Sequence, residues 1–312
     1  MNWLAHTKLH VLKLHELDFD DVTYYMPNYR DSTALRESIK QVGILNRPVV
    51  QERPCGGMIP VLGRRRLQEA ATLGVHESDV LVVSSDMPVS DGFLIAFFDN
   101  AGHRTFDSPT TAVVVKRLLD LFPREMVARS FLPILGVPPR GPRLERLRLL
   151  GTLEHRALKW LAEGRILEKT AVVLARLDPG DRAPLLDFLE KLGMNANKNE
   201  EVTANLYDLS VYQARPPADI IRDDAVRELT ADDDIPAPER AARFRDLIRS
   251  WKFPELVDKE REFREWCTGL PAVPNVKVWP ARSFENDEFT IEIRVSHRAS
   301  VERVLENLKD MK

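Results

Sequence analysis

The sequence Gly-Arg-Arg-Arg at residues 63–66 constrains the fold of this chain most strongly. It follows a strand-like run at residues 58–62 and precedes a helical pattern over residues 64–73. Glycine permits a sharp turn, and a helix that begins there presents unpaired N–H groups and the positive end of its dipole. Three guanidinium groups add bidentate donors for phosphate oxygens. The pattern predicts an anion site at this junction, and the alternative is a solvated helix start.

The segment before this turn predicts a helix followed by a β-hairpin. Apolar residues at helical spacing begin after a capping candidate at Asp31 or Ser32, and Gly43 is placed to end the helix. Runs at residues 47–51 and 58–62 predict two strands joined by a turn at 54–57. Helix, hairpin, turn and helix in this order predict a mixed α+β domain at the N-terminus.

Composition indicates an ordinary folded chain. Its 312 residues are 44% hydrophobic and 30% charged, which suits two or three domains. No membrane segment and no secretory signal are evident in the sequence. Cys55 and Cys267 lack the spacing of a metal site and are expected to be free thiols. We therefore expect a cytoplasmic protein that does not bind membranes.

A second motif lies downstream, where residues 97–104 read Phe-Phe-Asp-Asn-Ala-Gly-His-Arg. Together with Gly-Ile-Leu-Asn-Arg-Pro at 43–48, the hairpin and the Gly-Arg-Arg-Arg turn, it resembles the N-terminal domain of the ParB family. The usual forms there are Gly-x-x-x-Pro, Gly-acidic-Arg-Arg and Glu-Asn-x-x-Arg. The resemblance implies a ParB/sulfiredoxin-like mixed domain over residues 1–106, and Arg64 or Arg65 stands where sulfiredoxin carries its reactive cysteine.

In this family the matching segments bind a nucleoside triphosphate, typically CTP, with Mg²⁺. The resemblance implies that the metal faces Asp99 and Asn100, which would also be the catalytic residues of a weak CTPase. It implies that the nucleotide contacts the two glycine segments and the residues after the second motif, namely Gly43, Arg47, Pro48, Gly63, Arg64, Arg65, Arg66, His103 and Arg104.

The chain departs from the family's motifs at several positions. Arg47 stands where proline is usual, and Arg64 replaces an acidic residue. His103 replaces the last arginine of the second motif, with Arg104 one place later, and Asp99 is shorter than glutamate by one methylene. Hydrolysis needs a positioned water and metal, so we expect these changes to affect hydrolysis more than nucleotide binding.

The middle of the chain is basic, with eleven Lys or Arg against five Asp or Glu from Arg124 to Arg176. Its pattern has the outline of a helix-turn-helix, with a first helix ending near Gly136 and a second packed through Leu144, Leu147 and Leu150. The alternative is a solvated arginine face beside a proline-rich turn. If the segment binds DNA, the arginines that project toward it are Arg140, Arg143, Arg146 and Arg148.

The remaining chain predicts a boundary and a further domain. Family resemblance implies an all-helical, helix-turn-helix-type DNA-binding domain over residues 107–212, and proline and acid content predicts a linker at 213–238. A small α+β domain should follow at 239–312, with a helix over 240–267 interrupted at Pro254 and strands at 276–279 and 288–295. ParB proteins commonly dimerise through this region, so we expect a homodimer.

These features predict a ParB-like DNA-binding protein whose N-terminal domain binds CTP, or a related nucleotide, with Mg²⁺ and couples nucleotide state to conformation and DNA binding. Chromosome or plasmid segregation is the family's best-known role. One alternative is a nucleotide-using enzyme on the same fold, such as a small-molecule kinase. Another is a degenerate scaffold that no longer binds nucleotide, for which His103 and Asp99 are the best indications.

Overall fold

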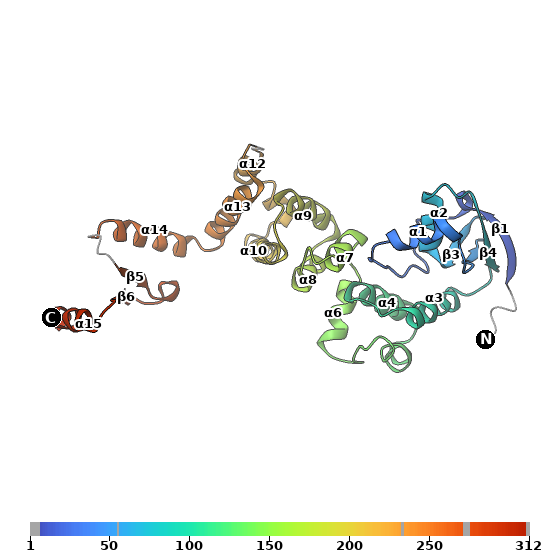
Figure 1. Cartoon of the computed structure of the whole chain (residues 1–312), viewed down its shortest axis with the longest axis horizontal. Helices are drawn as coiled ribbons and strands as arrows, with labels where there is room; N and C mark the ends of the chain where they lie inside the picture. The colour runs from blue at the N-terminus through green and yellow to red at the C-terminus, as the bar shows by residue number, and fades with distance from the viewer. Residues whose placement is uncertain (1–6, 55, 232–233, 271–274, 310–312) are drawn as a thin grey trace. The chain divides into compact units, whose positions relative to one another are not determined.

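The computed structural model describes residues 7–54, 56–231, 234–270 and 275–309 (Figure 1). The chain divides into two units. The first runs to Leu186 and includes Asn195–Thr203, and the second contains Asp187–Met194 and the residues from Ala204 onward. The first unit begins with a mixed domain of sheet and helices and continues into helices alone. No helix in the described residues is long and apolar enough to cross a membrane.

The N-terminal sheet has four strands in the order β1-β4-β2-β3. β2 (Val49–Glu52) and β3 (Met58–Leu62) pair antiparallel and form the predicted hairpin. β4 (Glu77–Val83) lies parallel to β2, and β1 (Lys8–Lys13) lies antiparallel to β4 at the edge. The motif analysis predicts neither β1 nor β4. They complete the sheet against which the helices pack, so the hairpin is not an isolated unit.

Two helices confirm the predicted pattern around the hairpin (Figure 1). α1 (Thr33–Val42) ends at Gly43, whose φ is +73°, and α2 (Arg64–Thr72) begins directly after Gly63. Asp31 Oδ2 accepts the Thr33 N–H at 3.1 Å beside the start of α1. The core between these helices and the sheet contains Leu12, Leu14, Leu17, Ile39, Val50, Leu67, Ala70 and Val80.

The segment between the short 3₁₀ helix η2 (Leu14–Glu16) and α1 has neither helix nor strand. We call residues 18–32 the connector. Its Tyr24 and Met26 are buried although its backbone is irregular. Side-chain hydrogen bonds must therefore hold it, because no ladder of backbone bonds does so.

After β4 the first unit continues with α3 (Val89–His103), which packs on β3, and α4 (Ser108–Leu121), which Asp107 caps by accepting the Thr110 N–H. α6 (Pro142–Leu150), α7 (His155–Ala162) and α8 (Glu168–Arg176) follow. Leu144, Leu147 and Leu150 are buried, as predicted. α9 (Pro179–Leu192) and α10 (Ala196–Gln213) contain residues of both units.

The predicted first helix of the helix-turn-helix is not one regular helix. The chain forms a short α5 (Arg124–Met126), a π-helical turn η3 (Val127–Phe131) and further turns up to Gly136. Pro133 lacks an N–H and its ring crowds the preceding turn, which disfavours a regular helix through to Gly136. Phe131 is buried here and contacts Phe97 at 5.6 Å between ring centroids.

The stretch predicted as a linker lies within the second unit and carries α11 (Pro217–Ile220) and α12 (Asp224–Ala231). α13 (Ala237–Lys252) and α14 (Pro254–Thr268) are separate helices because Pro254 starts the second, as predicted. β5 (Val276–Pro280), the turn η4 (Arg282–Phe284), β6 (Phe289–Ile293) and α15 (Arg298–Lys309) follow.

Burial in this last region differs from the prediction. Phe244 is buried and packs against Phe188 at 4.8 Å between ring centroids. The helical pattern over residues 240–267 predicts that Trp266 is buried, and the alternation over 288–295 predicts an apolar strand face with Phe289 and Ile291. Trp266 is instead 48% exposed, and Phe289 and Ile291 are 51% and 58% exposed. Phe289 stacks on Phe263 of α14 at 5.9 Å between ring centroids and lies 5.4 Å from the Trp266 ring, so α14 covers this apolar face only in part. Cys267 is a free thiol, and Cys55 lies outside the described residues.

We predict that Gly63→Ala destabilises the protein more than Gly74→Ala. Both glycines have a left-handed φ, +79° and +78°, and this conformation costs a residue with a Cβ about 1–2 kcal/mol. A Cβ at Gly63 would also lie 3.0 Å from Pro48 Cβ and 3.1 Å from Arg66 Nη2, whereas nothing lies within 4 Å at Gly74. Urea unfolding midpoints measure the difference, and equal losses would contradict close packing around Gly63.

Candidate functional site

A cavity of about 160 Å³ lies at the start of α2. Three parts of the chain line it: the connector, the end of β3 with the first turn of α2, and the end of α3. Their side chains bring the Gly-Arg-Arg-Arg turn next to the second sequence motif, which lies more than thirty residues away. The lining residues are Tyr24, Tyr25, Met26, Asn28, Pro60, Val61, Leu62, Gly63, Arg64, Arg65, Arg66, Asp99, Asn100 and Arg104.

Gly63 makes the turn that places α2 at the cavity. Its left-handed backbone ends β3 and directs the chain at once into α2, whose free N–H groups then face the lining side chains. Helix N-termini favour negative charge because of these N–H groups and the dipole. No acidic residue lies in the first turn of α2 to occupy this end.

The Arg64 guanidinium is half-buried against the connector. It donates hydrogen bonds to the carbonyl oxygens of Phe19 and Asp21, and it lies over the Tyr25 ring at 4.7 Å from the centroid. Arg64 Nε is buried and has no hydrogen-bond partner. Burial lowers the pKa of Arg64 from its ordinary value, although an arginine remains charged at neutral pH.

Arg65 and Arg66 extend in two other directions. Arg65 Nη2 donates to the Arg30 carbonyl at 2.8 Å and to Ser32 Oγ at 2.8 Å, at the end of the connector. Arg66 Nη1 donates to the Asn46 carbonyl, in the Gly-x-x-x-x-Pro segment. Burial lowers the pKa of Arg66, and the nearby negative charge of Asp99 opposes that effect.

Arg104 reaches the cavity from the end of α3. Its Nη1 donates to the Pro27 carbonyl at 2.9 Å, its Nη2 to the Met26 carbonyl at 3.2 Å, and its Nε to Asn100 Oδ1 at 2.9 Å. Burial is the largest cause of the lowered pKa of Arg104. Four arginines therefore line one cavity, three from the start of α2 and one from the end of α3.

None of these four arginines forms an ion pair with a carboxylate among the described residues. Their partners are mostly backbone carbonyl oxygens, which carry only partial charge. The positive charge is partly desolvated, and the carboxylates that act on it, such as Asp21 near Arg64 and Asp99 near Arg66, lie beyond ion-pair distance. This arrangement favours an incoming anion. Phosphate oxygens suit the site because a guanidinium can donate to two of them at once.

The residues predicted to hold a metal offer few ligands. Asp99 is the one carboxylate that lines the cavity, and its side chain is 40% exposed. Asn100 is engaged within its own helix, where Nδ2 donates to the Ala96 carbonyl at 2.9 Å and Oδ1 accepts from Arg104. No cluster of three His, Cys, Asp or Glu that could bind a metal exists in the described chain. Such a site fits Mg²⁺ only when phosphate oxygens and waters complete the octahedron.

The other predicted nucleotide contacts lie outside the cavity lining. Arg47 is 53% exposed and its Nε lies 3.8 Å from Asp79. His103 is 79% exposed, and its Nδ1 lies 2.6 Å from the Asp99 carbonyl oxygen of the preceding turn. Gly43 ends α1, and Pro48 abuts Gly63 without lining the cavity. Of the last two residues of the second motif, Arg104 lines the cavity and His103 does not.

The motif analysis missed the connector. Tyr24, Tyr25, Met26 and Asn28 form one wall of the cavity, and they come from a segment without periodic pattern. The signal that marks them is two adjacent tyrosines and a methionine within a stretch rich in Asp, Asn and Pro. Large amphipathic rings in such a stretch indicate a packed segment, since a solvated loop has no need of them.

The four arginines predicted to face DNA lie in a different electrostatic setting. Arg143 and Arg146 both pair with Glu168, at 3.1 and 3.2 Å, and Arg148 pairs with Glu145 at 2.8 Å. Arg140 is exposed and forms no ion pair within the part of the chain that the structure describes. Much of the positive charge on α6 is therefore neutralised locally, and the arginines join α6 to α8.

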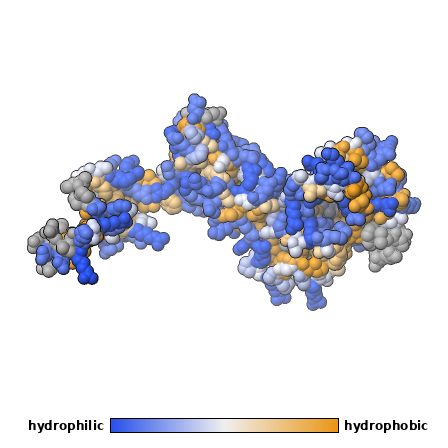
Figure 2. All heavy atoms as spheres, viewed as in Figure 1, coloured by the Kyte–Doolittle hydropathy of each residue, from blue (hydrophilic) through white to orange (hydrophobic). Residues whose placement is uncertain are grey.

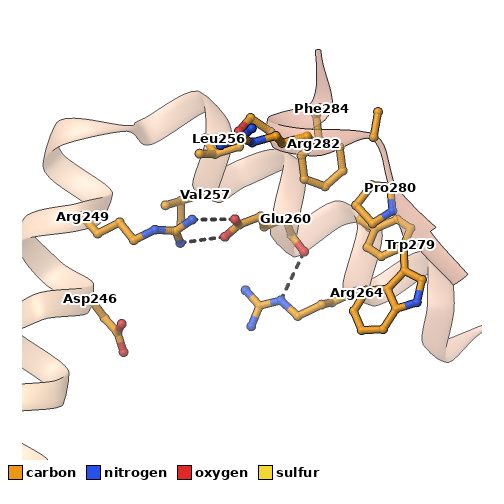
Figure 3. Close-up of a pocket in the computed structure, with 13 residues that line it drawn as sticks. Asp246, Arg249, Leu256, Val257, Glu260, Arg264, Trp279, Pro280, Arg282 and Phe284 are labelled. Carbon is orange, nitrogen blue, oxygen red and sulfur yellow. Dashed lines mark hydrogen bonds and ion pairs between the residues drawn. The ribbon is translucent and has the colours of Figure 1, made fainter. Parts of the chain in front are cut away.

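A larger cavity, of about 760 Å³, lies in the second unit between α13, α14 and the β5–η4 turn (Figure 3). Arg249 faces into it but makes a two-bond pair with Glu260, at 2.5 and 2.7 Å, and Arg264 Nε donates to the Glu260 carbonyl at 3.2 Å. Arg249, the arginine that faces the cavity from α13, is thus neutralised by Glu260. The smaller cavity at α2 is the better candidate for a ligand site, because its arginines form no ion pair among the described residues.

No family model and no curated protein sequence matches the chain. Among solved structures it is similar to C-terminally truncated chromosome-partitioning protein ParB from Caulobacter crescentus, complexed with CTP-γ-S, at 18% identity and a TM-score of 0.27 over 58% of this chain and 98% of that one. The same protein complexed to the centromeric parS site gives 15% identity and a TM-score of 0.30, over 62% and 98% of the two chains. A Pnob8-like ParB-N domain gives 14% identity and a TM-score of 0.34, over 57% of this chain and 88% of that one. Likenesses this distant carry no argument about function, which depends on this chain's own residues.

Proposed function

We propose that the chain is a ParB-like protein that binds a nucleoside triphosphate, CTP in the first instance, at the α2 cavity. The observation that carries the proposal is that Arg64, Arg65, Arg66 and Arg104 line one cavity without an ion pair to any described carboxylate. A triphosphate supplies several charged acceptors in a row, which matches guanidinium groups arranged around one helix N-terminus. The order of the sequence motifs supports the same ligand.

Magnesium fits this proposal as a companion of the phosphates. Asp99, with Asn100 if it gives up its bonds within the helix, would contribute one or two oxygens, and the ligand would provide others. Hydrolysis is a further proposal and depends on the same two residues. With one carboxylate at the cavity to place both metal and water, we expect turnover to be slow.

We predict that the protein binds CTP in the presence of Mg²⁺ and that Arg65→Ala or Arg66→Ala weakens this binding at least about tenfold. Each charged hydrogen bond contributes about 1.5–3 kcal/mol, so loss of one guanidinium suffices for that change. Isothermal titration calorimetry with CTP, ATP, GTP and UTP measures both affinity and nucleotide preference.

Lys40→Ala is the matched control, because it removes one exposed positive charge from α1, which does not line the cavity. It should leave the affinity unchanged. Absence of heat with every nucleotide at millimolar concentration, with the folded state verified by circular dichroism, would rule out the proposal.

DNA binding by the helical part of the first unit is a second element of the proposal. The basic composition of residues 124–176 supports it, and the ion pairs on α6 limit how much of that charge can contact phosphate. Contacts of this kind give affinity that depends on salt and not on sequence. Arg140, exposed and unpaired among the described residues, is the best candidate.

We predict that affinity for duplex DNA falls with added salt and that Arg140→Ala lowers the slope of log K against log salt by about 1, the loss of one phosphate contact. Electrophoretic mobility or fluorescence anisotropy across a salt series measures the slope. Arg227→Ala, a change of an exposed arginine in α12, should leave it unaltered. Affinity independent of salt would show that the basic segment is a solvated surface.

Homodimerisation through the C-terminal region is the third element. An isolated two-stranded sheet is marginally stable, yet β5–β6 exposes Phe289 and Ile291 on one face. Trp266 and Leu305 are also about half exposed nearby in sequence, and Figure 2 shows apolar atoms at the surface of the part that Figure 1 labels α14, β5 and β6. Exposed apolar surface of this kind marks an interface, and a second copy would cover it.

We predict that Ile291→Glu converts the protein from dimer to monomer, because a carboxylate cannot be buried unpaired in an apolar interface. Thr290→Glu is the control: Thr290 precedes Ile291 in β6, and successive side chains of a strand point to opposite faces, so Thr290 lies on the other face. Sedimentation velocity at several concentrations distinguishes the species. A wild-type protein that is monomeric at high concentration contradicts this element alone.

A further inference from the structure

We propose that the connector, residues 18–32, is an autoinhibitory strap that competes with the phosphates of the ligand for the same guanidinium groups. The inference rests on the proposed nucleotide site and concerns its regulation. In the structure described here the strap holds the cavity in a contracted form. Ligand binding would transfer the arginines from the connector to phosphate and release the connector.

The contacts that support this lie along the whole connector. Arg64 donates to the carbonyl oxygens of Phe19 and Asp21 near its start. Arg104 donates to those of Met26 and Pro27 in its middle. Arg65 donates to those of Arg30 and Asp31, and to Ser32 Oγ, at its end. Three arginines that line the cavity therefore help to hold the connector in place.

The size of the cavity gives an independent reason. Pockets for drug-sized ligands usually enclose about 300–1,000 Å³, and this one encloses about 160 Å³. Such a space accommodates phosphate groups but not a complete nucleoside triphosphate. Tyr24, Tyr25, Met26 and Asn28 of the connector form one of its walls, so movement of that segment enlarges it.

Transfer of the guanidinium groups from the connector's carbonyl oxygens to phosphate oxygens is favourable. A charged phosphate oxygen is a stronger acceptor for a guanidinium than a neutral carbonyl, because the hydrogen bond is assisted by charge on both sides. A carbonyl that loses its arginine must find another donor, and for a buried segment the available donor is water. The connector then has to leave the cavity wall for its carbonyl groups to become solvated.

The connector also touches the helical part of the first unit. His155, the first residue of α7, lies against two of its tyrosines, with ring centroids 5.5 Å from Tyr29 and 6.3 Å from Tyr25. Tyr25 in turn carries the Arg64 guanidinium on its ring. Tyr29 Oη is buried without a hydrogen-bond partner, so its present position lacks one stabilising bond. Release of the strap would free the N-terminus of α7, which links the cavity to the basic helices.

Thr110→Val tests the strap without touching the cavity. Thr110 Oγ1 donates to the Pro27 carbonyl at 3.0 Å, and Thr110 does not line the cavity. Loosening the connector should raise the fraction of open protein and tighten CTP binding by about fivefold, the equivalent of one ordinary hydrogen bond. Thr111→Val is the matched control, because Thr111 Oγ1 donates within α4's first turn, to the Asp107 carbonyl at 2.7 Å.

Arg53→Gln is a second variant at the other end of the connector, where Arg53 pairs with Asp18 at 3.2 Å and with Asp21. It should tighten binding in the same direction and keeps the test valid if Thr110→Val fails to fold. Hydrogen-exchange mass spectrometry on the full chain gives a second readout. With CTP and Mg²⁺, amides of residues 18–32 should exchange faster while those of α2 are protected.

The outcomes separate the strap from the nucleotide site. CTP binding by the wild type with equal affinity in both loosened variants, and no faster exchange in the connector, overturns the strap and leaves the proposed function intact. Binding seen only in the loosened variants supports a strap that closes the site fully. No CTP binding by the wild type or by either variant overturns both proposals.

Discussion

The hydrogen bonds from arginine to backbone carbonyl oxygens determine the arrangement of the N-terminal domain. Without them five carbonyl groups of the connector would lose the donors that the structure gives them, those of Phe19, Asp21, Met26, Arg30 and Asp31. The same bonds hold the guanidinium groups in place although none of them forms an ion pair among the described residues. The same contacts thus stabilise an irregular segment and leave the arginines available to an anion. Ion pairs to carboxylates could hold the arginines in place too, but they would neutralise the positive charge.

The two groups of arginine in this chain show why a count of charges is a poor guide. Residues 124–176 have the clearest excess of positive charge, yet three of the four arginines expected to face DNA are ion-paired with Glu168 or Glu145. The turn at 63–66 contributes only three charges and has none neutralised by an ion pair among the described residues. Local pairing, which depends on tertiary contacts, decides which positive charge a ligand can use.

Elements with strong local signals could be predicted from the sequence. Gly43 and Gly63 mark the end of α1 and the start of α2, and Pro254 separates α13 from α14. β1 and β4 could not be predicted by the same reasoning, because their pairing joins segments about seventy residues apart. The connector wall and the Arg104 contacts were missed for a similar reason: both depend on long-range packing. Pro133, by contrast, was a visible local signal against a regular helix up to Gly136.

The position of β1 has a consequence for how the chain folds during synthesis. β1 pairs only with β4, so Lys8–Lys13 emerges from the ribosome long before Glu77–Val83 is available. Until then Leu12, a fully buried residue in the finished sheet, has no strand to lie beside. The hairpin β2–β3 and its two helices can form earlier from local contacts, and the sheet closes last at β4. β1 is therefore made well before its pairing partner and is among the last parts of this sheet to fold.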